Sequence, residues 1–315
     1  MNGQRIQLKV PLENAGDRLD QTLSKLIPDF SRGRIQQWIK AGRVLVDGMQ
    51  KRPRDRVMGG EEVIVEAIFE EQIECRPQAL DLQIIYQDEA LLVIDKPAGL
   101  VVHPAVGNPD GTLQNGLLYL DPTLIQLPRA GIVHRLDKET SGLLVVARTP
   151  ASHHYLVDQL QQRAIHREYR AVAQGVMTAG GSVDAPIGRH PGHRTKMAVV
   201  SNGKHAVTHY RVLERYSAHT YLKVKLETGR THQIRVHMAH IHHPLVGDPV
   251  YGGRFKTPKG ATPELLRELK GFKRQALHAR KLGLTHPDSG EWMEWESPLP
   301  ADLSNLLKSL RGFAE

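Results

Sequence analysis

An acid in a basic setting is the feature of this chain best suited to chemistry. Asp137 stands between Arg135 and Lys138 in GIVHRLDKETSGLLVVART, directly before an apolar run that predicts a strand. Loops that enter strands are where a rigid sheet presents functional groups. An acid beside two cations should stay ionised, which suits a nucleophile or an electrostatic stabiliser rather than a general acid. A surface aspartate in a salt-bridged turn would explain the same residues, so the loop alone leaves both interpretations open.

Other kinds of active site fit the sequence less well. Glu139 is too close to Asp137 to flank a glycosidic bond from the opposite side, so we assign it a structural or solvent role. Ser141 lies in no G-x-S-x-G elbow. The histidines of HMAHIHHP have neither the spacing nor the carboxylate of a zinc site, and VYGGRFKTPKG is not a P-loop. We therefore predict no metal site.

Composition indicates a polyanionic partner. The chain has 315 residues, 40% of them hydrophobic, and a net charge of +8. This length allows two domains, and such a charge balance suits RNA. We find no apolar run of membrane-spanning length and no signal-peptide core, and therefore expect no membrane partner. The single cysteine, Cys75, excludes an internal disulfide and fits a reducing, cytoplasmic setting.

The N-terminal part predicts a small unit of two helices and a hairpin-like sheet. Apolar spacing predicts a helix over residues 17–28, ended by Pro28, and a second helix from an N-cap at Ser31 to Gly42. Two short strands, RVLVDG and EEVIVEAI, should follow.

Charge is sorted along this unit. Residues 31–60 carry eight Lys and Arg against two Asp, and residues 61–74 then carry six Glu and no base. Arg32, Arg34 and Lys40 of the second helix have no acidic partner at i±4, and a second basic cluster follows in the loop at residues 51–56, which favours an RNA-binding face over a solvated helix face. The acidic stretch indicates an extended linker at the end of the unit. The RNA-binding residues we predict are Arg32, Arg34, Lys40, Arg43, Lys51 and Arg52.

The rest of the chain predicts a larger α+β domain. From residue 82 onward, strands outnumber helices, alternate with period two and should pair mostly antiparallel in a large mixed sheet. Near its middle, THQIRVHMAHI predicts a helix capped by Thr231 with Ile234 on its apolar stripe. We predict domains at residues 1–75 and 82–312.

Two resemblances follow from these motifs. The first unit resembles the S4 RNA-binding domain through DRLDQTLSKL, SRGRIQQWIKAGRVLVDG and GGEEVIVE. The second resembles the RluA family of pseudouridine synthases, because the Asp137 stretch occurs in order with three further motifs. Those motifs are VIDKPAGLVVHP, REYRAV and LETGRTHQIRVHMAHIHHPLVGDPVYG.

The family resemblance implies an isomerase. Such enzymes break the C1′–N1 bond of a uridine in RNA, turn the uracil and rejoin it through C5, with no cofactor. Asp137 would be the essential aspartate, attacking the ribose or the base or acting as a base at the sugar. Tyr169 would stack on the uracil and take the C5 proton, and Arg230 would pair with Asp137. Arg135 would insert where the flipped nucleotide left, and Ile234 would pack in the base pocket.

The resemblance also implies the substrate. It points to uridines of 23S ribosomal RNA in the helix 69 hairpin loop, presented as free RNA or in large-subunit particles, and to a role in large-subunit maturation. Unpaired loop bases cost less to flip. A non-catalytic RNA-binding or assembly factor would keep the basic face and lose the acid. A hydrolytic glycosylase would need a second carboxylate to activate water, and the sequence offers no obvious candidate. We expect a monomer.

Overall fold

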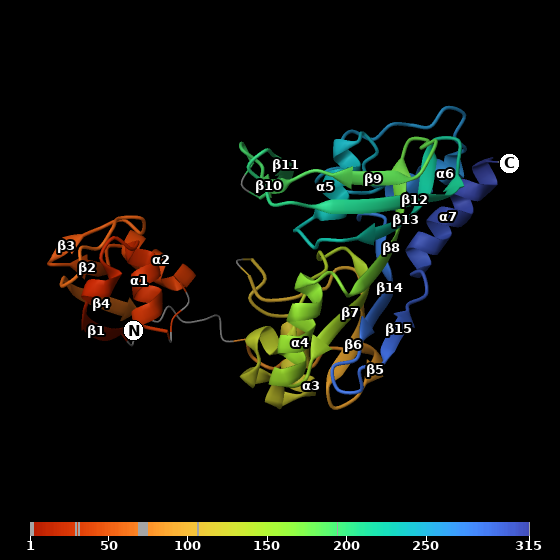
Figure 1. Cartoon of the computed structure of the whole chain (residues 1–315). Coiled ribbons are helices and arrows are strands. Elements are labelled where there is room, and N and C mark those ends of the chain that lie inside the picture. Colours follow the sequence, from red (N-terminus) through yellow and green to blue (C-terminus); the bar gives the residue numbers. More distant parts are fainter. Residues whose placement is uncertain are drawn as a thin grey trace. The chain divides into compact units, whose positions relative to one another are not determined.

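A computed structural model describes residues 3–28, 30, 32–68, 75–105, 107–193 and 195–314 (Figure 1). The chain divides into two compact units, Met1–Glu74 and Cys75–Glu315. The predicted N-cap Ser31 and the acidic stretch 69–74 lie outside the described residues. Within the part of the chain that the structure describes, no helix is long and apolar enough to cross a membrane.

The N-terminal unit packs two helices on a four-stranded antiparallel sheet of order β1-β4-β2-β3. The predicted helices are confirmed, and Pro28 follows the end of the first. Leu19 and Leu23 of that helix pack against Ile35 and Trp38 of the second. The elements are β1 (Gly3–Lys9), η1 (Leu12–Asn14), α1 (Leu19–Leu26), α2 (Arg32–Lys40), β2 (Val44–Val46), β3 (Met49–Gln50) and β4 (Glu62–Ile68).

A buried acid ties the two helices together. Asp20 on α1 is fully buried and accepts hydrogen bonds from Arg18, Arg32 and Gln36. Arg32 has no acidic partner at i±4 in the sequence, but in the folded unit its Nη2 lies 2.9 Å from Asp20 Oδ2. The sequence pattern missed this pair because the two residues meet across a helix–helix contact rather than along one helix.

We expect Asp20→Asn to destabilise the N-terminal unit by about 2 kcal/mol at neutral pH. Burial opposes ionisation, but the bonds from Arg18, Gln36 and Arg32 prevail and lower the pKa of Asp20 to about 2. In the unfolded chain this carboxyl protonates first, so its stabilisation is complete above pH 4 and is lost as the pH falls toward 2. Urea unfolding of both proteins, followed by Trp38 fluorescence with Trp292 and Trp295 replaced by Phe, measures the difference. An equal stability of both proteins at pH 7 would contradict the prediction.

The second unit is built on one large, mostly antiparallel sheet, as predicted. Nine strands form it in the order β5-β6-β7-β14-β8-β13-β12-β9, with β15 paired to β14, and β7 and β14 are parallel. The strands are β5 (Gln83–Gln87), β6 (Leu91–Lys96), β7 (Ser141–Ala147), β8 (His166–Gln174), β9 (Gly181–Asp184), β12 (Val207–Arg215), β13 (His219–Leu226), β14 (Leu277–Thr285) and β15 (Trp292–Glu296). A separate hairpin pairs β10 (Ile187–Arg189) with β11 (Met197–Val199).

Helices cover both faces of this sheet, with α3 and α4 near β6 and β7 and with α6 and α7 toward its other end (Figure 1). Their bounds are α3 (Leu113–Leu120), η2 (Pro122–Gln126), η3 (Pro128–Gly131), α4 (Pro150–Gln161), α5 (Gln233–His240), α6 (Pro263–Gly271) and α7 (Ala301–Ala314). Because β7 is buried on both faces, its sequence SGLLVVA is continuously apolar from Leu143 to Ala147 instead of alternating. Leu144 and Val146 join the cluster on one face, and Leu143 and Val145 join the cluster on the other.

Candidate active site

A cavity of about 580 Å³ opens in the second unit, where the segment before β7 faces the segment before α5. Its volume is typical of a small-ligand pocket. The charged side chains that line it are six arginines and two acids, so the cavity has a marked positive excess. These residues are Arg129, Arg135, Arg163, Arg167, Arg230, Arg235, Asp137 and Glu227.

Asp137 lies in this cavity, and its partner is Arg235. The Asp137 side chain is 14% exposed, and its Oδ2 accepts a hydrogen bond of 2.9 Å from Arg235 Nη1. The prediction that Arg230 pairs with Asp137 is therefore wrong. Arg230 lines the same cavity, but its Nε donates to the carbonyl of His205. Arg235 stands on the first turns of α5, which point at the loop before β7, whereas Arg230 precedes the helix.

A second carboxylate fixes Arg235. Asp248, whose side chain is fully buried, accepts from Arg235 Nε at 2.7 Å and from Nη2 at 2.9 Å. Asp248 Oδ1 also accepts from the backbone N–H groups of Val250 and Tyr251. Although burial opposes it, the contacts with Asp248 and Asp137 raise the pKa of Arg235 above its ordinary value. The fork geometry leaves one nitrogen for Asp137 and so fixes the direction of that carboxylate.

His232 lies beside Asp137, on the side of its other carboxylate oxygen. Its Nε2 lies 3.8 Å from Asp137 Oδ1, and its Nδ1 lies 2.8 Å from the hydroxyl of Tyr251. Burial lowers the pKa of His232 despite the opposing effect of Asp137, so the ring is neutral near pH 7. The N-cap of α5 is His232, in the left-handed region at φ 57°, and the prediction of Thr231 as that cap is wrong. The left-handed turn at this position directs the imidazole toward Asp137.

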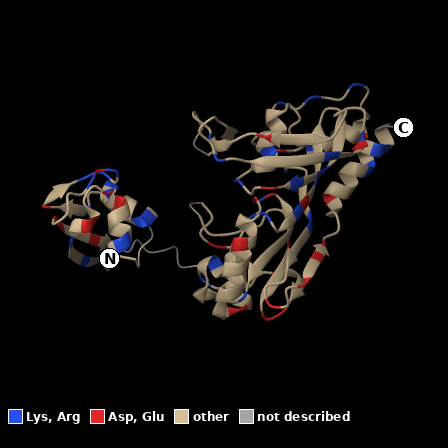
Figure 2. Ribbon diagram, in the orientation of Figure 1, with Lys and Arg blue, Asp and Glu red and all other residues tan. Residues whose placement is uncertain are grey.

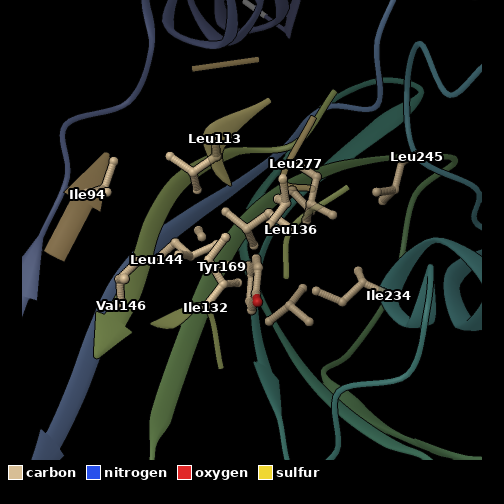
Figure 3. Packing of buried hydrophobic residues seen from close by; sticks show 14 of the residues in the cluster. Ile94, Leu113, Ile132, Leu136, Leu144, Val146, Tyr169, Ile234, Leu245 and Leu277 are labelled. Carbon is tan, nitrogen blue, oxygen red and sulfur yellow. The ribbon is translucent and has the colours of Figure 1, made fainter. Parts of the chain in front are cut away.

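Tyr169 and Ile234 supply the apolar side of the cavity. Both line it, and both belong to the main buried cluster with Ile132 and Leu136 (Figure 3). Tyr169 lies on β8, where it pairs with Val224 of β13 in the centre of the sheet. Burial raises the pKa of Tyr169, so its hydroxyl remains protonated at neutral pH. The flat ring and the branched side chain offer the surface against which a planar base can stack.

A buried lysine holds the loop that carries Asp137. Lys96, at the end of β6, is fully buried, and its Nζ donates to the carbonyls of Pro97, Leu100 and Lys138 at 2.8, 2.9 and 3.0 Å. Burial lowers the pKa of Lys96 to about 7. The motif DKPAG therefore acts on the site by positioning, because its ammonium joins the loop after β6 to the residue that follows Asp137.

Arg135 is exposed at the cavity, in keeping with a side chain that can reach into RNA.

The histidines of HMAHIHHP form no metal site: buried His237 contacts the hydroxyl of Thr208 and the carbonyl of Ala185. Throughout the described ranges, no group of three or more His, Cys, Asp and Glu could hold a metal ion.

Sequence reasoning missed three residues of this site, namely Arg235, Asp248 and His232. A signal existed for Arg235, since its sequence neighbours Ile234 and Val236 are apolar and lie on different sides of the helix, which predicts a helix that is buried on more than one face. A charged residue in such a helix predicts a buried ion pair. No comparable signal identified Asp248 as its partner, because the pairing depends on how the chain returns after α5.

Comparison with known proteins agrees with this architecture. Residues 90–240 match the family described as RNA pseudouridylate synthase, and residues 17–63 match the S4 domain. A "Ribosomal large subunit pseudouridine synthase D" of Pseudomonas aeruginosa is 59% identical over 96% of this chain and 95% of its own length. The protein of the same name from Escherichia coli K12 is 56% identical over 98% and 95%.

Solved structures extend the comparison. The human RNA Pseudouridylate Synthase Domain Containing 4 aligns with a TM-score of 0.57 and 28% identity, covering 73% of this chain and 93% of its own. The chain belongs to the RNA pseudouridylate synthase family, with an S4 domain at its N-terminus. The family expected from the four motifs is thus confirmed, as are the S4 domain and the α+β fold.

Proposed function

We propose that this protein isomerises specific uridines of 23S ribosomal RNA to pseudouridine, in the helix 69 hairpin loop, and thereby contributes to maturation of the large ribosomal subunit. The observation that carries the proposal is Asp137, held by buried Arg235 in an arginine-lined cavity. The two bacterial relatives support the choice of RNA, since each is named a ribosomal large subunit pseudouridine synthase D.

Asp137 is the catalytic residue of this proposal. Arg235 occupies Oδ2, so Oδ1 is the oxygen that acts on the flipped uridine. The C1′–N1 bond breaks, the uracil turns, a C1′–C5 bond forms, the proton on C5 leaves, and N1 takes up a proton. Atoms and electrons balance without an oxidant, a reductant or added water. Tyr169 stacks on the base in the same cavity, and Ile234 packs beside it. Because the Tyr169 hydroxyl is protonated at neutral pH, it receives the C5 proton only as it releases its own.

Base flipping precedes the chemistry. The glycosidic bond of a stacked nucleotide is shielded, so the target must leave the stack to reach a cavity whose acid is only 14% exposed. Arg135, exposed at the rim, fills the space that the nucleotide leaves. Loop uridines meet this requirement at the lowest cost because they are unpaired.

The S4 domain supplies a second RNA contact in this proposal. Lys40, Lys51 and Arg52 are exposed, and Figure 2 marks the Lys and Arg positions of the unit in blue. We expect the triple replacement of these residues by Ala to weaken RNA binding. It should also reduce the magnitude of the slope of log K against log salt by about 2, because each of the three lost phosphate contacts contributes roughly 0.7. Titration of labelled 23S RNA fragments at several salt concentrations measures both quantities.

The control for that triple variant removes the same charge elsewhere. Arg267→Ala, Lys270→Ala and Lys273→Ala alter three residues in or beside α6, on the second unit. The binding slope of this control should stay close to that of the wild type. If the S4 variant kept the wild-type slope, the predicted basic face would not contact RNA.

The proposed function is tested by mapping pseudouridine in 23S RNA. Primer extension after carbodiimide treatment compares cells that lack this protein with cells that carry it or its Asp137→Asn variant. Stops in the helix 69 loop should vanish with the gene and return only with the wild-type protein. Stops that persist without the gene would refute the assignment of substrate.

A further inference from the structure

Arg167 is a buried cation of the cavity that the mechanism above leaves without a role. Its residue exposure is 9%, and it lines the cavity together with Tyr169, two positions along β8 and therefore on the same face of the strand. Its Nε is buried without a hydrogen-bond partner. Among the residues that the structure describes, its side chain has no ion pair.

Two of the other arginines that line the cavity are paired with acids of the protein, whereas Arg129, Arg135 and Arg230, which have no ion pair among the described residues, are exposed to solvent. Arg163 pairs with Glu227 at 2.8 Å, and Arg235 pairs with Asp137 and Asp248. An unpaired guanidinium at this depth is costly, because removing a charge from water is repaid only by a partner. Its retention inside a cavity indicates that the partner arrives with the ligand.

The surroundings of Arg167 hold its guanidinium in place. A Cβ placed on Gly229, in the TGR segment, would lie 2.8 Å from Arg167 Nη1, so the absence of a side chain there makes room for this nitrogen. His134, also in the cavity, is neutral near pH 7, since burial, aided by the Arg167 charge, lowers its pKa to about 3. The guanidinium thus presents its donors at a fixed position without competition from an acid.

We propose that Arg167 binds a backbone phosphate of the RNA at the flipped uridine, an inference that rests on the proposed function. A guanidinium presents paired N–H donors that match phosphate oxygens. The cavity has six arginines against two acids, an excess that suits an anion rather than a neutral carbonyl. Arg167 is accordingly a substrate-binding residue beside Tyr169, and the acid Asp137 carries the chemistry.

The first experiment compares Arg167→Ala and Arg167→Lys with the wild type on a synthetic helix 69 hairpin RNA. We expect Arg167→Ala to weaken binding by about 10- to 100-fold and to reduce the salt slope by about 0.7. Arg167→Lys should keep the slope and recover part of the affinity, because it keeps a cation but loses the fork. Arg267→Ala, an exposed arginine of α6, removes the same charge and should change neither value.

A second experiment locates the phosphate. Neutral methylphosphonate linkages are introduced one at a time around the target uridine. One linkage should weaken binding by the wild-type protein as much as Arg167→Ala does, and should cause no further loss in that variant. Gly229→Ala, which crowds the guanidinium, should lower the affinity of the wild type and have little effect in the Arg167→Ala background.

The outcomes separate the two proposals. If the wild type forms no pseudouridine in 23S RNA, the proposed function fails. If the wild type is active and Arg167→Ala binds the RNA as tightly as the wild type does, the proposed phosphate contact fails and the proposed function stands. A loss of affinity with an unchanged salt slope and no sensitive linkage would identify a uracil contact and overturn the phosphate assignment. Thermal unfolding shows whether Arg167→Ala folds. If it does not fold, the Arg167→Lys variant and the linkage scan on the wild type still test the phosphate contact.

Discussion

We expect Asp137→Asn to lower pseudouridine formation by at least about 1,000-fold, a loss typical of a removed nucleophile or base. The amide has nearly the shape of the carboxylate but cannot supply its negative charge or electron pair. Arg235 keeps its bidentate contact with Asp248, so no buried charge loses all its partners. Release of tritium from RNA labelled at uridine C5 measures the reaction, and hairpin titration measures binding.

A neighbouring acid provides the matched control for that variant. Glu139 lies two residues after Asp137, and its known contact is through its backbone carbonyl, which accepts from Arg274. We expect Glu139→Gln to retain activity within a few-fold of the wild type, and both variants to unfold at wild-type temperatures. Clear turnover by Asp137→Asn would exclude Asp137 as the catalytic group. Loss of RNA binding in that variant would instead indicate a binding role.

The second large effect concerns Arg235, whose truncation we expect to reduce stability as well as activity. Arg235→Ala would leave Asp248, whose side chain is fully buried, without its counter-charge. Removing one member of a buried pair costs about 3–5 kcal/mol, since the remaining charge is uncompensated. Activity should also fall, because Asp137 loses the donor that orients it. Urea unfolding followed by Trp292 and Trp295 fluorescence, with Trp38 replaced by Phe, measures the stability of the second unit.

A second substitution distinguishes charge from packing in this variant. In Arg235→Ala/Asp248→Asn the lone carboxylate becomes neutral, while the oxygen that accepts from the N–H groups of Val250 and Tyr251 is kept. Stability should recover in part, and activity should not recover, because Asp137 still lacks its partner. If Arg235→Ala unfolds at wild-type urea concentrations, the pair contributes little, and Asp137 is positioned by other contacts.

The sequence alone predicted the architecture and offered Asp137 as a candidate for chemistry. Apolar periodicity placed the helices of the first unit, and period-two alternation placed the sheet of the second. Local rules succeed there because each pattern is read along a single element. Asp137 was a candidate because its own neighbours, Arg135 and Lys138, mark it as an acid in a basic setting before a strand, although they fit a surface turn as well. Four motifs in order then indicated the family.

The tertiary structure decided which groups face one another. Arg235 and Arg230 lie in the same motif, and only the direction of α5 after the left-handed turn at His232 selects Arg235 as the partner of Asp137. Arg32 and Asp20 likewise meet across two helices.

The tertiary structure also determines which charged side chains are buried. Lys96 and Arg167 lie in two of the quoted motifs, but their sequence neighbours do not indicate that the Lys96 ammonium donates to three carbonyls or that Arg167 lies in the cavity without an ion pair. A sequence specifies the elements through contacts of short range, whereas the partners of a buried charge are set by how distant segments pack, and those partners determine what this site can do.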